Sequence, residues 1–562
     1  MSKTLPLLEI KNLSIVPQND ESKLLCDNVS FRVNENQIIG VVGESGSGKT
    51  LTALSLLGLL APGLKVIGGD IVLHKGNTQI SLLSLSPHEL LNVRGHQIGM
   101  IFQEPMTSLN PSMTCGNQVM EAILTHEKLS ESQARDKVFN LFEKVRLPNP
   151  EGIFKSYPHQ LSGGQRQRVM IAMAVSCNPR LLIADEPTTA LDVTVQKSIF
   201  ALLRELQSEF QMSIIFISHD LGIISELADE VVVMYKGKVV ETGKTSDILN
   251  QPQHPYTKAL LACRPSQYNK GKRLITIQDT TGELSHEDRQ PVSKESGILL
   301  EVKNLSVYFS SHGKSNFLSR KKSQALFDLS FEVFTGETLG LVGESGSGKT
   351  TLSRAVLRLI ESKSDQIRYK NVDLGKLKGE ALRKFRKNIQ IIFQYPYSSI
   401  NPKETIGSII MEPMIVHNLN GGYKQKKEKV LEILDKVQLN SDMYHRYPHQ
   451  LSGGQRQRVG IARALAVEPE LIICDESVSA LDVSIQAQVL NLLNDLKRDF
   501  GLTYIFISHD LNVVRYMSDR IIVLKSGKIE EKGNPDDIFT NPSSGYTREL
   551  IAAIPGKGKI GI

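Results

Sequence analysis

The segment Gly43–Thr50 reads GESGSGKT, and the same letters recur at Gly343–Thr350. Each copy follows a short apolar run and precedes an apolar helical pattern, which is the setting of a phosphate-binding loop. In such a loop, main-chain N–H groups surround an anion, the lysine reaches the β- and γ-phosphates, and the threonine hydroxyl binds Mg²⁺. A glycine-rich turn that only caps a helix is the alternative, and the second copy disfavours it. The predicted nucleotide contacts are Gly43, Glu44, Ser45, Gly46, Ser47, Gly48, Lys49, Thr50, Gly343, Glu344, Ser345, Gly346, Ser347, Gly348, Lys349 and Thr350.

Two acidic pairs, Asp185-Glu186 and Asp475-Glu476, each end an apolar run. The aspartate of such a pair can hold Mg²⁺ through water, and the glutamate can polarise an attacking water as a general base. Phosphoryl transfer needs these groups because its catalysis consists mainly of positioning and charge neutralisation. An ordinary polar step at a strand end is the alternative, and the phosphate loop upstream favours the catalytic interpretation.

A histidine and a glutamine complete each predicted site. His219 and His509 lie in the repeated segment IFISHDL, where an imidazole could donate to the γ-phosphate. Gln103 and Gln394 follow other apolar runs, where an amide can contact Mg²⁺ or water. The predicted catalytic residues are Glu186, Glu476, His219 and His509, and the predicted metal-site residues are Thr50, Gln103, Asp185, Thr350, Gln394 and Asp475.

The segment LSGGQ opens an arginine-rich amphipathic helical pattern in both halves. Exposed N–H groups at a helix N-terminus form a second anion site, although serine is also a good N-cap for an ordinary helix. A second anion site that cannot complete the first one locally suggests a γ-phosphate clamp shared by the two halves. The residues assigned to it are Ser162, Gly163, Gly164, Gln165, Ser452, Gly453, Gly454 and Gln455.

The elements that must position these residues occur as two copies of one domain. The offset between copies is 300 at GESGSGKT and 290 at YPHQLSGGQRQRV, so the first copy carries about ten extra residues, which we assign to a surface loop. The predicted domains are 1–265 and 298–562, joined by a linker at 266–297 that contains a short strand at 274–277.

Apolar runs before the motifs predict parallel strands that are covered on both faces, with ligands at their carboxyl ends. A helical insertion follows the glutamine in each copy, and about 35 residues at the start of each copy resemble short alternating strands. The predicted strands are Ile38–Val42, Gly99–Phe102, Leu181–Ala184, Ile214–Ile217 and Gln390–Phe393, and the predicted helices of the insertions are Glu121–Leu129, Ser132–Val145 and Tyr423–Val437.

The composition excludes several classes of protein. The 562 residues are 40% apolar and 22% charged, with a net charge of +6, as in an ordinary globular protein rather than a dedicated DNA-binding one. Tryptophan is absent and aromatics make up 6%, which poorly supplies a base-stacking surface. The five cysteines form no C-x-x-C pair, so we expect no zinc site and a reducing compartment. We expect neither a signal peptide nor a membrane span, because the most apolar stretch, Leu51–Gly69, is interrupted by polar residues.

The order of phosphate loop, Gln, LSGGQ, Asp-Glu, ALD and His resembles the nucleotide-binding domain of ABC ATPases, and the resemblance covers both halves. It implies an α/β fold with two tandem P-loop NTPase (ABC-type) domains, each with a parallel-sheet core, an antiparallel β subdomain and a helical subdomain. In that family two domains bind ATP and Mg²⁺ head to tail. The resemblance therefore pairs Gly43–Thr50 with Ser452–Gln455 and Gly343–Thr350 with Ser162–Gln165, and it places Asp192 and Asp482 of ALD at the seam.

The two halves depart from that family in different ways. Family members usually stack an aromatic side chain on adenine, and the second half offers Tyr308 and Phe309 for cofactor binding, whereas the first half has Val16 and Pro17. Glu476 is followed by Ser-Val-Ser where Glu186 is followed by Pro-Thr-Thr, and we expect little effect. Both halves keep the catalytic residues, so we predict two hydrolytically competent sites.

The tails of the two halves, His254–Leu260 and Gly545–Leu550, resemble those of the oligopeptide, dipeptide, nickel and glutathione importer ATPases. Some members carry a cysteine cluster in this tail. Here the first tail has only Cys263 and the second has none, so we predict no iron–sulfur cluster. A short docking helix is the alternative interpretation of each tail.

The resemblance implies an ATP-hydrolysing, energy-coupling subunit (a translocase) of an importer for peptides or related small solutes. It would lie at the cytoplasmic face of the inner membrane as a peripheral, intramolecular pseudo-dimer. Its implied partners are integral membrane permease subunits, as a heterodimer, and indirectly an extracytoplasmic solute-binding protein. No nucleic acid is expected. A soluble twin ATPase acting on ribosomes or nucleic acid is the alternative, and it usually has a long charged linker or zinc-binding cysteines. A non-hydrolysing binding module conflicts with two intact Asp-Glu pairs.

Overall fold

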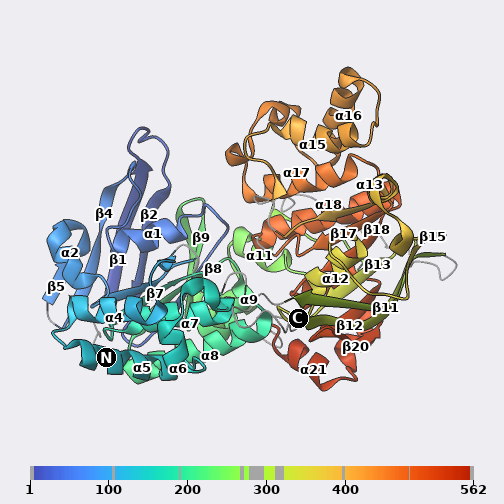
Figure 1. The fold of residues 1–562 in the computed structure, drawn as a ribbon. Helices are drawn as coiled ribbons and strands as arrows, with labels where there is room; N and C mark the ends of the chain where they lie inside the picture. The colour runs from blue at the N-terminus through green and yellow to red at the C-terminus, as the bar shows by residue number, and fades with distance from the viewer. Residues whose placement is uncertain are drawn as a thin grey trace. The chain divides into compact units, whose positions relative to one another are not determined.

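The computed structural model describes residues 6–76, 78–103, 108–188, 191–265, 271–277, 297–310, 322–394, 399–479 and 481–556. The chain divides into two compact units, which are Met1–Ala262 with Pro555–Ile562, and Cys263–Ile554. Each unit contains a four-stranded sheet, a six-stranded sheet and a group of helices (Figure 1). Residues 266–270 and 278–296 of the predicted linker lie outside the described residues.

The six-stranded sheet of the first unit has the strand order β10-β9-β3-β8-β7-β6. Its strands pair in parallel except for β10, which lies antiparallel to β9 at the edge. All residues of β3, β7 and β8 are buried, which explains their continuous apolar runs. The strands are β3 (Ile38–Val42), β6 (Ile98–Ile101), β7 (Leu181–Asp185), β8 (Ser213–Ser218), β9 (Glu230–Tyr235) and β10 (Lys238–Lys244).

The second unit repeats this sheet with the order β16-β17-β18-β13-β19-β20. Its edge strand β20 is again antiparallel to its neighbour. The strands are β13 (Thr338–Val342), β16 (Ile389–Ile392), β17 (Leu471–Asp475), β18 (Thr503–Ile507), β19 (Arg520–Lys525) and β20 (Lys528–Gly533). The predicted parallel strands are thus confirmed in both units, with bounds that differ by about one residue.

A smaller antiparallel sheet stands beside each large one, with the order β2-β1-β4-β5 in the first unit and β12-β11-β14-β15 in the second. The strands are β1 (Leu8–Pro17), β2 (Cys26–Val33), β4 (Leu64–Lys75), β5 (Thr78–Ser81), β11 (Ile298–Ser310), β12 (Lys322–Phe334), β14 (Gln366–Tyr369) and β15 (Val372–Asp373). Strand β4 has 12 residues whereas β14 has four. The assignment of the extra residues of the first copy to a surface loop is therefore wrong, because most of them lengthen a paired strand.

The predicted helical insertions are confirmed: they lie between β6 and β7 in the first unit and between β16 and β17 in the second. They consist of α4 (Cys115–His126), α5 (Glu131–Lys144), α6 (Pro150–Lys155) and α7 (Gly163–Val175), and of α15 (Ile406–Val416), α16 (Tyr423–Lys436) and α17 (Gly453–Leu465). The remaining helices are α1 (Lys49–Leu56), α2 (Pro87–Val93), α8 (Val193–Phe210), α9 (Leu221–Leu227), α10 (Thr245–Asn250), α11 (Pro255–Ala262), α12 (Lys349–Val356), α13 (Gly379–Phe385), α18 (Val483–Phe500), α19 (Leu511–Met517), α20 (Pro535–Thr540) and α21 (Gly545–Ala552). Within the described part of the chain, none of the helices combines the length and apolarity that a membrane crossing needs.

The predicted short strand at 274–277 is wrong, because this segment is irregular and docks on α18 of the second unit. The main chain of Leu274 exchanges two hydrogen bonds with the Asn491 side chain, of 3.0 Å from its N–H and 2.8 Å to its carbonyl. Arg273 forms a bidentate ion pair with Asp495, at 3.0 and 2.9 Å. The side-chain amide of Asn491 thus makes the two hydrogen bonds that a neighbouring strand would otherwise make with Leu274.

Two further contacts fix this docked segment to the second unit. The Tyr516 hydroxyl donates to the carbonyl of Lys272 at 2.9 Å. Cys263 and Leu274 are buried within the hydrophobic core of the second unit. The first unit has Ala201 at the position that corresponds to Asn491, so the amide that binds Leu274 is present in the second copy alone. Residues 263–265 and 271–277 therefore belong structurally to the second unit.

Candidate active sites

Each phosphate loop (the GESGSGKT segment) connects the central strand of a large sheet to a helix that begins at its lysine. The first glycine of the loop has no room for a side chain, because a Cβ on Gly43 would lie 2.1 Å from the carbonyl oxygen of Met234. A Cβ on Gly343 would lie 2.2 Å from the carbonyl oxygen of Leu524. The loop is thus packed tightly against the neighbouring strand, which positions its main chain.

The phosphate-loop lysines are buried inside their own loops. The Nζ of Lys49 donates to the carbonyls of Gly43 and Glu44 at 2.7 and 2.8 Å. Lys349 makes the same two contacts in the second unit, again at 2.7 and 2.8 Å. A cation that is only 6% exposed in the first unit and 4% in the second creates a strongly positive centre for an anion.

The threonine that follows each lysine contacts the strand-end aspartate. The Thr50 hydroxyl lies 3.2 Å from Oδ1 of Asp185, and Thr350 lies 3.3 Å from Asp475. Burial raises the pKa of each aspartate to about 6, and the neighbouring glutamate charge acts in the same direction. A half-buried hydroxyl and a buried carboxylate fit Mg²⁺, because both are oxygen ligands and the cation would neutralise the desolvated charge of the carboxylate.

The glutamate after each aspartate has a backbone conformation that is rare for its residue type. The φ angle of Glu186 is 45° and that of Glu476 is 48°, both in the left-handed region. The main-chain N–H of Glu186 donates to Ile217 at 3.1 Å, and that of Glu476 donates to Ile507 at 3.0 Å. Strained residues of this kind persist where the surrounding structure imposes them, and they concentrate at functional sites.

In the first unit, two predicted site residues converge on one carboxylate oxygen. Oε2 of Glu186 lies 3.2 Å from Nδ1 of His219 and accepts a 3.3 Å hydrogen bond from the Gln103 amide. Gln103 comes from the end of β6 and His219 from the end of β8, so three strands contribute to this cluster. The carboxyl edge of the sheet therefore brings the predicted base, histidine and amide together.

The second unit has the same arrangement with a shorter amide contact. Oε2 of Glu476 lies 3.3 Å from Nδ1 of His509 and accepts a 2.7 Å hydrogen bond from Gln394. Burial acts to raise the pKa of Glu476, but the hydrogen bond and charge of His509 and the charge of Lys349 hold it below its usual value. The carboxylate is thus ionised at neutral pH and able to accept a proton from water.

The LSGGQ serines cap the helices that they precede. Ser162 Oγ accepts from the N–H of Gln165 at 3.3 Å, and the Gln165 side chain accepts from the N–H of Ser162 at 3.0 Å. Ser452 and Gln455 form the same capping box. The capped helix start is therefore confirmed, while binding of an anion there stays a prediction. Asp192 and Asp482, from the ALD segments, are the N-cap residues of α8 and α18.

The residues aligned at the predicted adenine-stacking position differ in exposure between the two units. Tyr308 is 40% exposed and Phe309 is 46% exposed, and the Lys363 ammonium lies 5.5 Å from the centroid of the Tyr308 ring. Val16 of the first unit is fully buried. The second unit thus offers an exposed aromatic face at a position where the first unit offers none.

The structure adds one residue to each site that spacing along the sequence did not indicate. The hydroxyl of Tyr256, on tail helix α11, accepts a 3.0 Å hydrogen bond from the N–H of Glu44. Tyr546, on α21, does the same for Glu344 at 3.1 Å. The Tyr-Thr pair recurs in both tails, which could have marked the tyrosine as a candidate site residue, but the pair does not indicate a contact with the phosphate loop.

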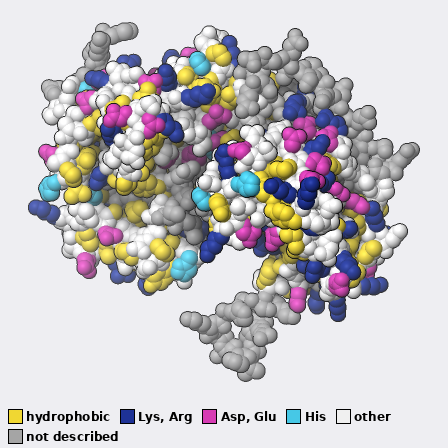
Figure 2. Space-filling model, turned by 90° about the horizontal axis from the view of Figure 1, so that it is seen from above, with side chains coloured by type: hydrophobic (Ala, Val, Ile, Leu, Met, Phe, Trp, Pro, Cys, Tyr) yellow, Lys and Arg dark blue, Asp and Glu magenta, His cyan; other side chains and the backbone are white. Residues whose placement is uncertain are grey.

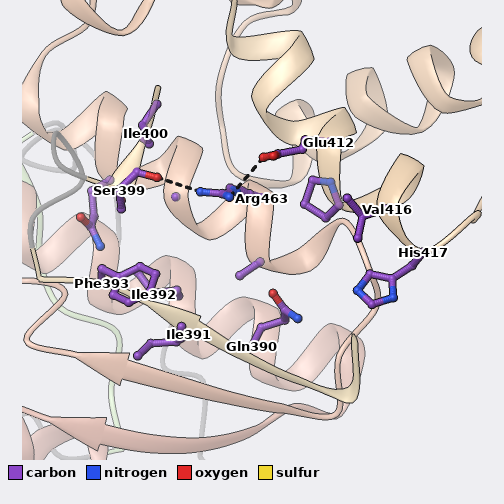
Figure 3. Close-up of a pocket in the computed structure, with 14 residues that line it drawn as sticks. Gln390, Ile391, Ile392, Phe393, Ser399, Ile400, Glu412, Val416, His417 and Arg463 are labelled. Carbon is purple, nitrogen blue, oxygen red and sulfur yellow. Dashed lines mark hydrogen bonds and ion pairs between the residues drawn. The ribbon is translucent and has the colours of Figure 1, made fainter. Parts of the chain in front are cut away.

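A groove in the second unit lies between the end of β16 and helices α15 and α17, and it encloses about 240 Å³ (Figure 3). Phe393 and Val416 contribute apolar surface that is 38% and 42% exposed. Arg463 crosses the groove, donating to the carbonyl of Ser399 at 2.8 Å and to Glu412 at 3.2 Å. The groove thus combines apolar walls with an ion pair that spans it.

Comparison with known proteins gives the same assignment in both halves. Residues 26–189 and 326–479 match the family model described as "ABC transporter", and residues 240–289 match "Oligopeptide/dipeptide transporter, C-terminal region". The chain is 46% identical over 561 residues to the glutathione import ATP-binding protein GsiA of Shigella dysenteriae serotype 1, covering 98% of this chain and 89% of that protein. It is 45% identical over 561 residues to GsiA of Escherichia coli K12, with the same coverage. A solved dimeric ATP-binding cassette with ADP and Pi covers 42% of this chain and 98% of its own, at 29% identity and a TM-score of 0.38.

Proposed function

Because this chain belongs to the ABC transporter family of ATP-binding proteins, we propose that it is the energy-coupling subunit of an importer. It hydrolyses ATP to ADP and phosphate and drives separate membrane permease subunits. The observation that carries the proposal is the repeated cluster at the carboxyl edge of each large sheet. There a buried lysine, a Thr–Asp pair and a Glu–His–Gln group occupy equivalent positions in the two units.

The arrangement supports in-line attack of water on the γ-phosphate. Glu186 accepts the proton of the attacking water as its oxygen bonds to phosphorus, and the bond to the β–γ bridging oxygen breaks. Gln103 orients Glu186, and His219 adds a second hydrogen-bonding group beside the γ-phosphate. Lys49 neutralises phosphate charge. Thr50 and Asp185 would hold Mg²⁺, which would supply further charge neutralisation.

Each nucleotide is held jointly by the two halves in this proposal. Gly43–Thr50 is completed by Ser452–Gln455, and Gly343–Thr350 by Ser162–Gln165. Two capped helix starts support it, because their main-chain amides are suited to a γ-phosphate but belong to the helical insertions rather than to the phosphate loops. Fusion of the halves raises their effective concentration, so that closure is intramolecular.

The permease partners are proposed to dock on the helical insertions, at the groove between α15 and α17 in the second unit (Figure 3). The corresponding surface of the first unit differs, because Met170 and Met173 stand where the second unit has Gly460 and Arg463. Two unlike surfaces suit two unlike permease subunits, which supports a heterodimer. The chain would then lie peripherally at the cytoplasmic face of the inner membrane, and an extracytoplasmic solute-binding protein would act indirectly through the permeases.

The proposed cargo is a peptide or a related small solute, of the dipeptide, oligopeptide, nickel or glutathione type. The support is the identity to glutathione import proteins and the oligopeptide/dipeptide C-terminal region. A soluble twin ATPase acting on ribosomes or nucleic acid is the alternative. On the face in Figure 2, Lys and Arg side chains are interspersed with Asp and Glu, which does not favour a nucleic-acid surface.

Affinity purification of the tagged chain from detergent-solubilised membranes, followed by an assay of Mg²⁺-dependent phosphate release, tests this function. We expect integral membrane subunits to co-purify and ATP to be hydrolysed. Recovery of rRNA or DNA without membrane subunits would support the alternative, and a chain that binds ATP without hydrolysing it would contradict the catalytic assignment.

A further inference from the structure

We propose that Tyr256 and Tyr546, on the two tail helices, are positioning residues of the phosphate loops and set the affinity of each site for ATP. The proposal rests on the proposed function, because it concerns the sites that bind ATP. Each tail would then be part of a nucleotide site rather than a separate docking element.

In the first unit, a single carboxylate anchors the start of the tail helix. Glu241, on the edge strand β10, accepts hydrogen bonds from the main-chain N–H of Gln253 at 2.7 Å and of His254 at 3.1 Å. Nδ1 of His254 in turn accepts from the N–H of Tyr256 at 3.1 Å. The helix start is therefore fixed at the residue before its tyrosine.

The second unit builds the same anchor from different residues. Glu531, on β20, accepts from the N–H of Ser543 at 2.8 Å and of Ser544 at 3.2 Å. Ser544 Oγ accepts from the N–H of Tyr546 at 3.2 Å, as the histidine does in the first unit. A histidine in the first unit and a serine in the second make the same hydrogen bond to the N–H of the tyrosine. Both units therefore place the tyrosine in the same way, although these residues differ.

The surroundings of the two aromatic rings also differ, although both rings are buried. Tyr256 is 4% exposed and stacks on Tyr235, with ring centroids 4.1 Å apart. Tyr546 is 6% exposed, and the Lys525 ammonium lies 4.6 Å from its centroid. What the two rings share is the hydroxyl that accepts from the second residue of the phosphate loop, at 3.0 and 3.1 Å.

The contact reaches the phosphate-binding lysine through one residue. The N–H of Glu44 is held by Tyr256, and the carbonyl of Glu44 accepts from Lys49 at 2.8 Å. Glu344 links Tyr546 to Lys349 in the same way, also at 2.8 Å. Removing the tyrosine hydroxyl takes this acceptor away from the main-chain N–H of the loop glutamate. The carbonyl of the same glutamate binds the lysine, so the lysine becomes less firmly positioned. The anion site is then less ordered before the nucleotide binds.

The test removes only the hydroxyl groups, by Tyr256→Phe, Tyr546→Phe and both together in the full chain. Calorimetric titration with Mg²⁺ and ADP reports affinity, and steady-state phosphate release gives KM and kcat. We expect each single variant to weaken one of the two binding events about fivefold, as loss of one hydrogen bond predicts. The KM for ATP should rise, kcat should change less than twofold, and the melting temperature should stay constant. Tyr423→Phe, which removes a hydroxyl on α16 that lies 3.3 Å from the Tyr444 hydroxyl, is the matched control away from the phosphate loops.

Unchanged affinity and KM in both tyrosine variants would overturn the proposal. A fall in melting temperature large enough to explain the whole change in affinity would also overturn the proposal, because the tyrosines would then only stabilise the fold. A wild-type chain that binds ADP but releases no phosphate would contradict the proposed function instead, and the calorimetric comparison would still decide this inference.

Discussion

Nδ1 of His509 lies 3.3 Å from Oε2 of Glu476, and the first unit repeats this relationship between His219 and Glu186 at 3.2 Å. In both units the glutamate occupies a left-handed turn at the end of a buried strand. The geometry gives each half its own candidate base beside a hydrogen-bonding imidazole. The two sites are therefore equivalent in the residues proposed for catalysis.

We expect Glu186→Gln and Glu476→Gln each to lower the rate of phosphate release about twofold or more, since a general base contributes about 10²–10⁴-fold at its own site while the other site keeps its base. The amide keeps the size of the side chain but cannot accept the proton of water. Phosphate release by the purified full chain is the measurement. Glu205→Gln, on the exposed face of α8, is the control and should match the wild type. A wild-type rate in either active-site variant would refute two competent sites.

The buried Asp185 predicts a pH-dependent difference in stability between the wild type and Asp185→Asn. Its pKa is raised from 3.8 to about 6 by burial, so the ionised form is disfavoured in the folded state. Its contribution to stability is present below about pH 4 and is lost as the pH rises through 6. Without metal or nucleotide, the variant should therefore gain up to about 3 kcal/mol over the wild type between pH 4 and pH 8.

Thermal denaturation across that pH range, with the exposed Asp442→Asn as control, measures this difference. A constant difference between Asp185→Asn and the wild type at all pH values would mean that Asp185 is not desolvated as the structure places it.

Tyr308→Ala should weaken nucleotide binding at one of the two sites at least about fivefold, because stacking on a base contributes about 1 kcal/mol or more. The side chain is 40% exposed, so its loss should leave the fold intact. Calorimetric titration with ADP is the measurement, and Phe500→Ala, which removes another partly exposed ring, is the control. Two unchanged binding events would exclude Tyr308 from adenine recognition.

Gly460→Met should abolish co-purification of one permease subunit while ATP hydrolysis continues. A Cβ at Gly460 meets no atom within 4 Å, so the new side chain fills the groove between α15 and α17 without disturbing the core. Methionine is also a better helix former than glycine, by up to about 1 kcal/mol. Recovery of subunits from solubilised membranes is the measurement, and Lys436→Met, on α16, is the control. Full recovery of both permease subunits would place the docking surface elsewhere.

Much of each candidate site follows from the sequence because its residues end buried strands. Asp185, His219 and Gln103 come from three strands whose carboxyl ends must meet at one edge of a parallel sheet, and the structure brings them together there. The strands themselves were predictable because burial on both faces leaves an uninterrupted apolar run. Their bounds therefore needed little correction.

Other features depend on contacts that leave no local pattern. Tyr256 and Glu44 are 212 residues apart, and an isolated tyrosine in a tail carries no sign of its acceptor role. The apolar residues in 274–277 suggested a strand, but the main chain of Leu274 forms hydrogen bonds with the side-chain amide of Asn491 rather than with another strand. Spacing likewise could not reveal that the extra length of the first copy would extend β4, because a longer strand and a longer loop change the offset equally.

The docking of residues 272–277 on α18 and α19 decides where the polypeptide should be divided if its halves are to be produced separately. A C-terminal fragment that begins at 298 would lose Cys263 and Leu274 from its core and would leave the Asn491 amide and the Asp495 carboxylate without the partners they have here. A fragment that begins at Cys263 keeps them. The chain is therefore best divided at the peptide bond after Ala262, at the end of the first tail helix.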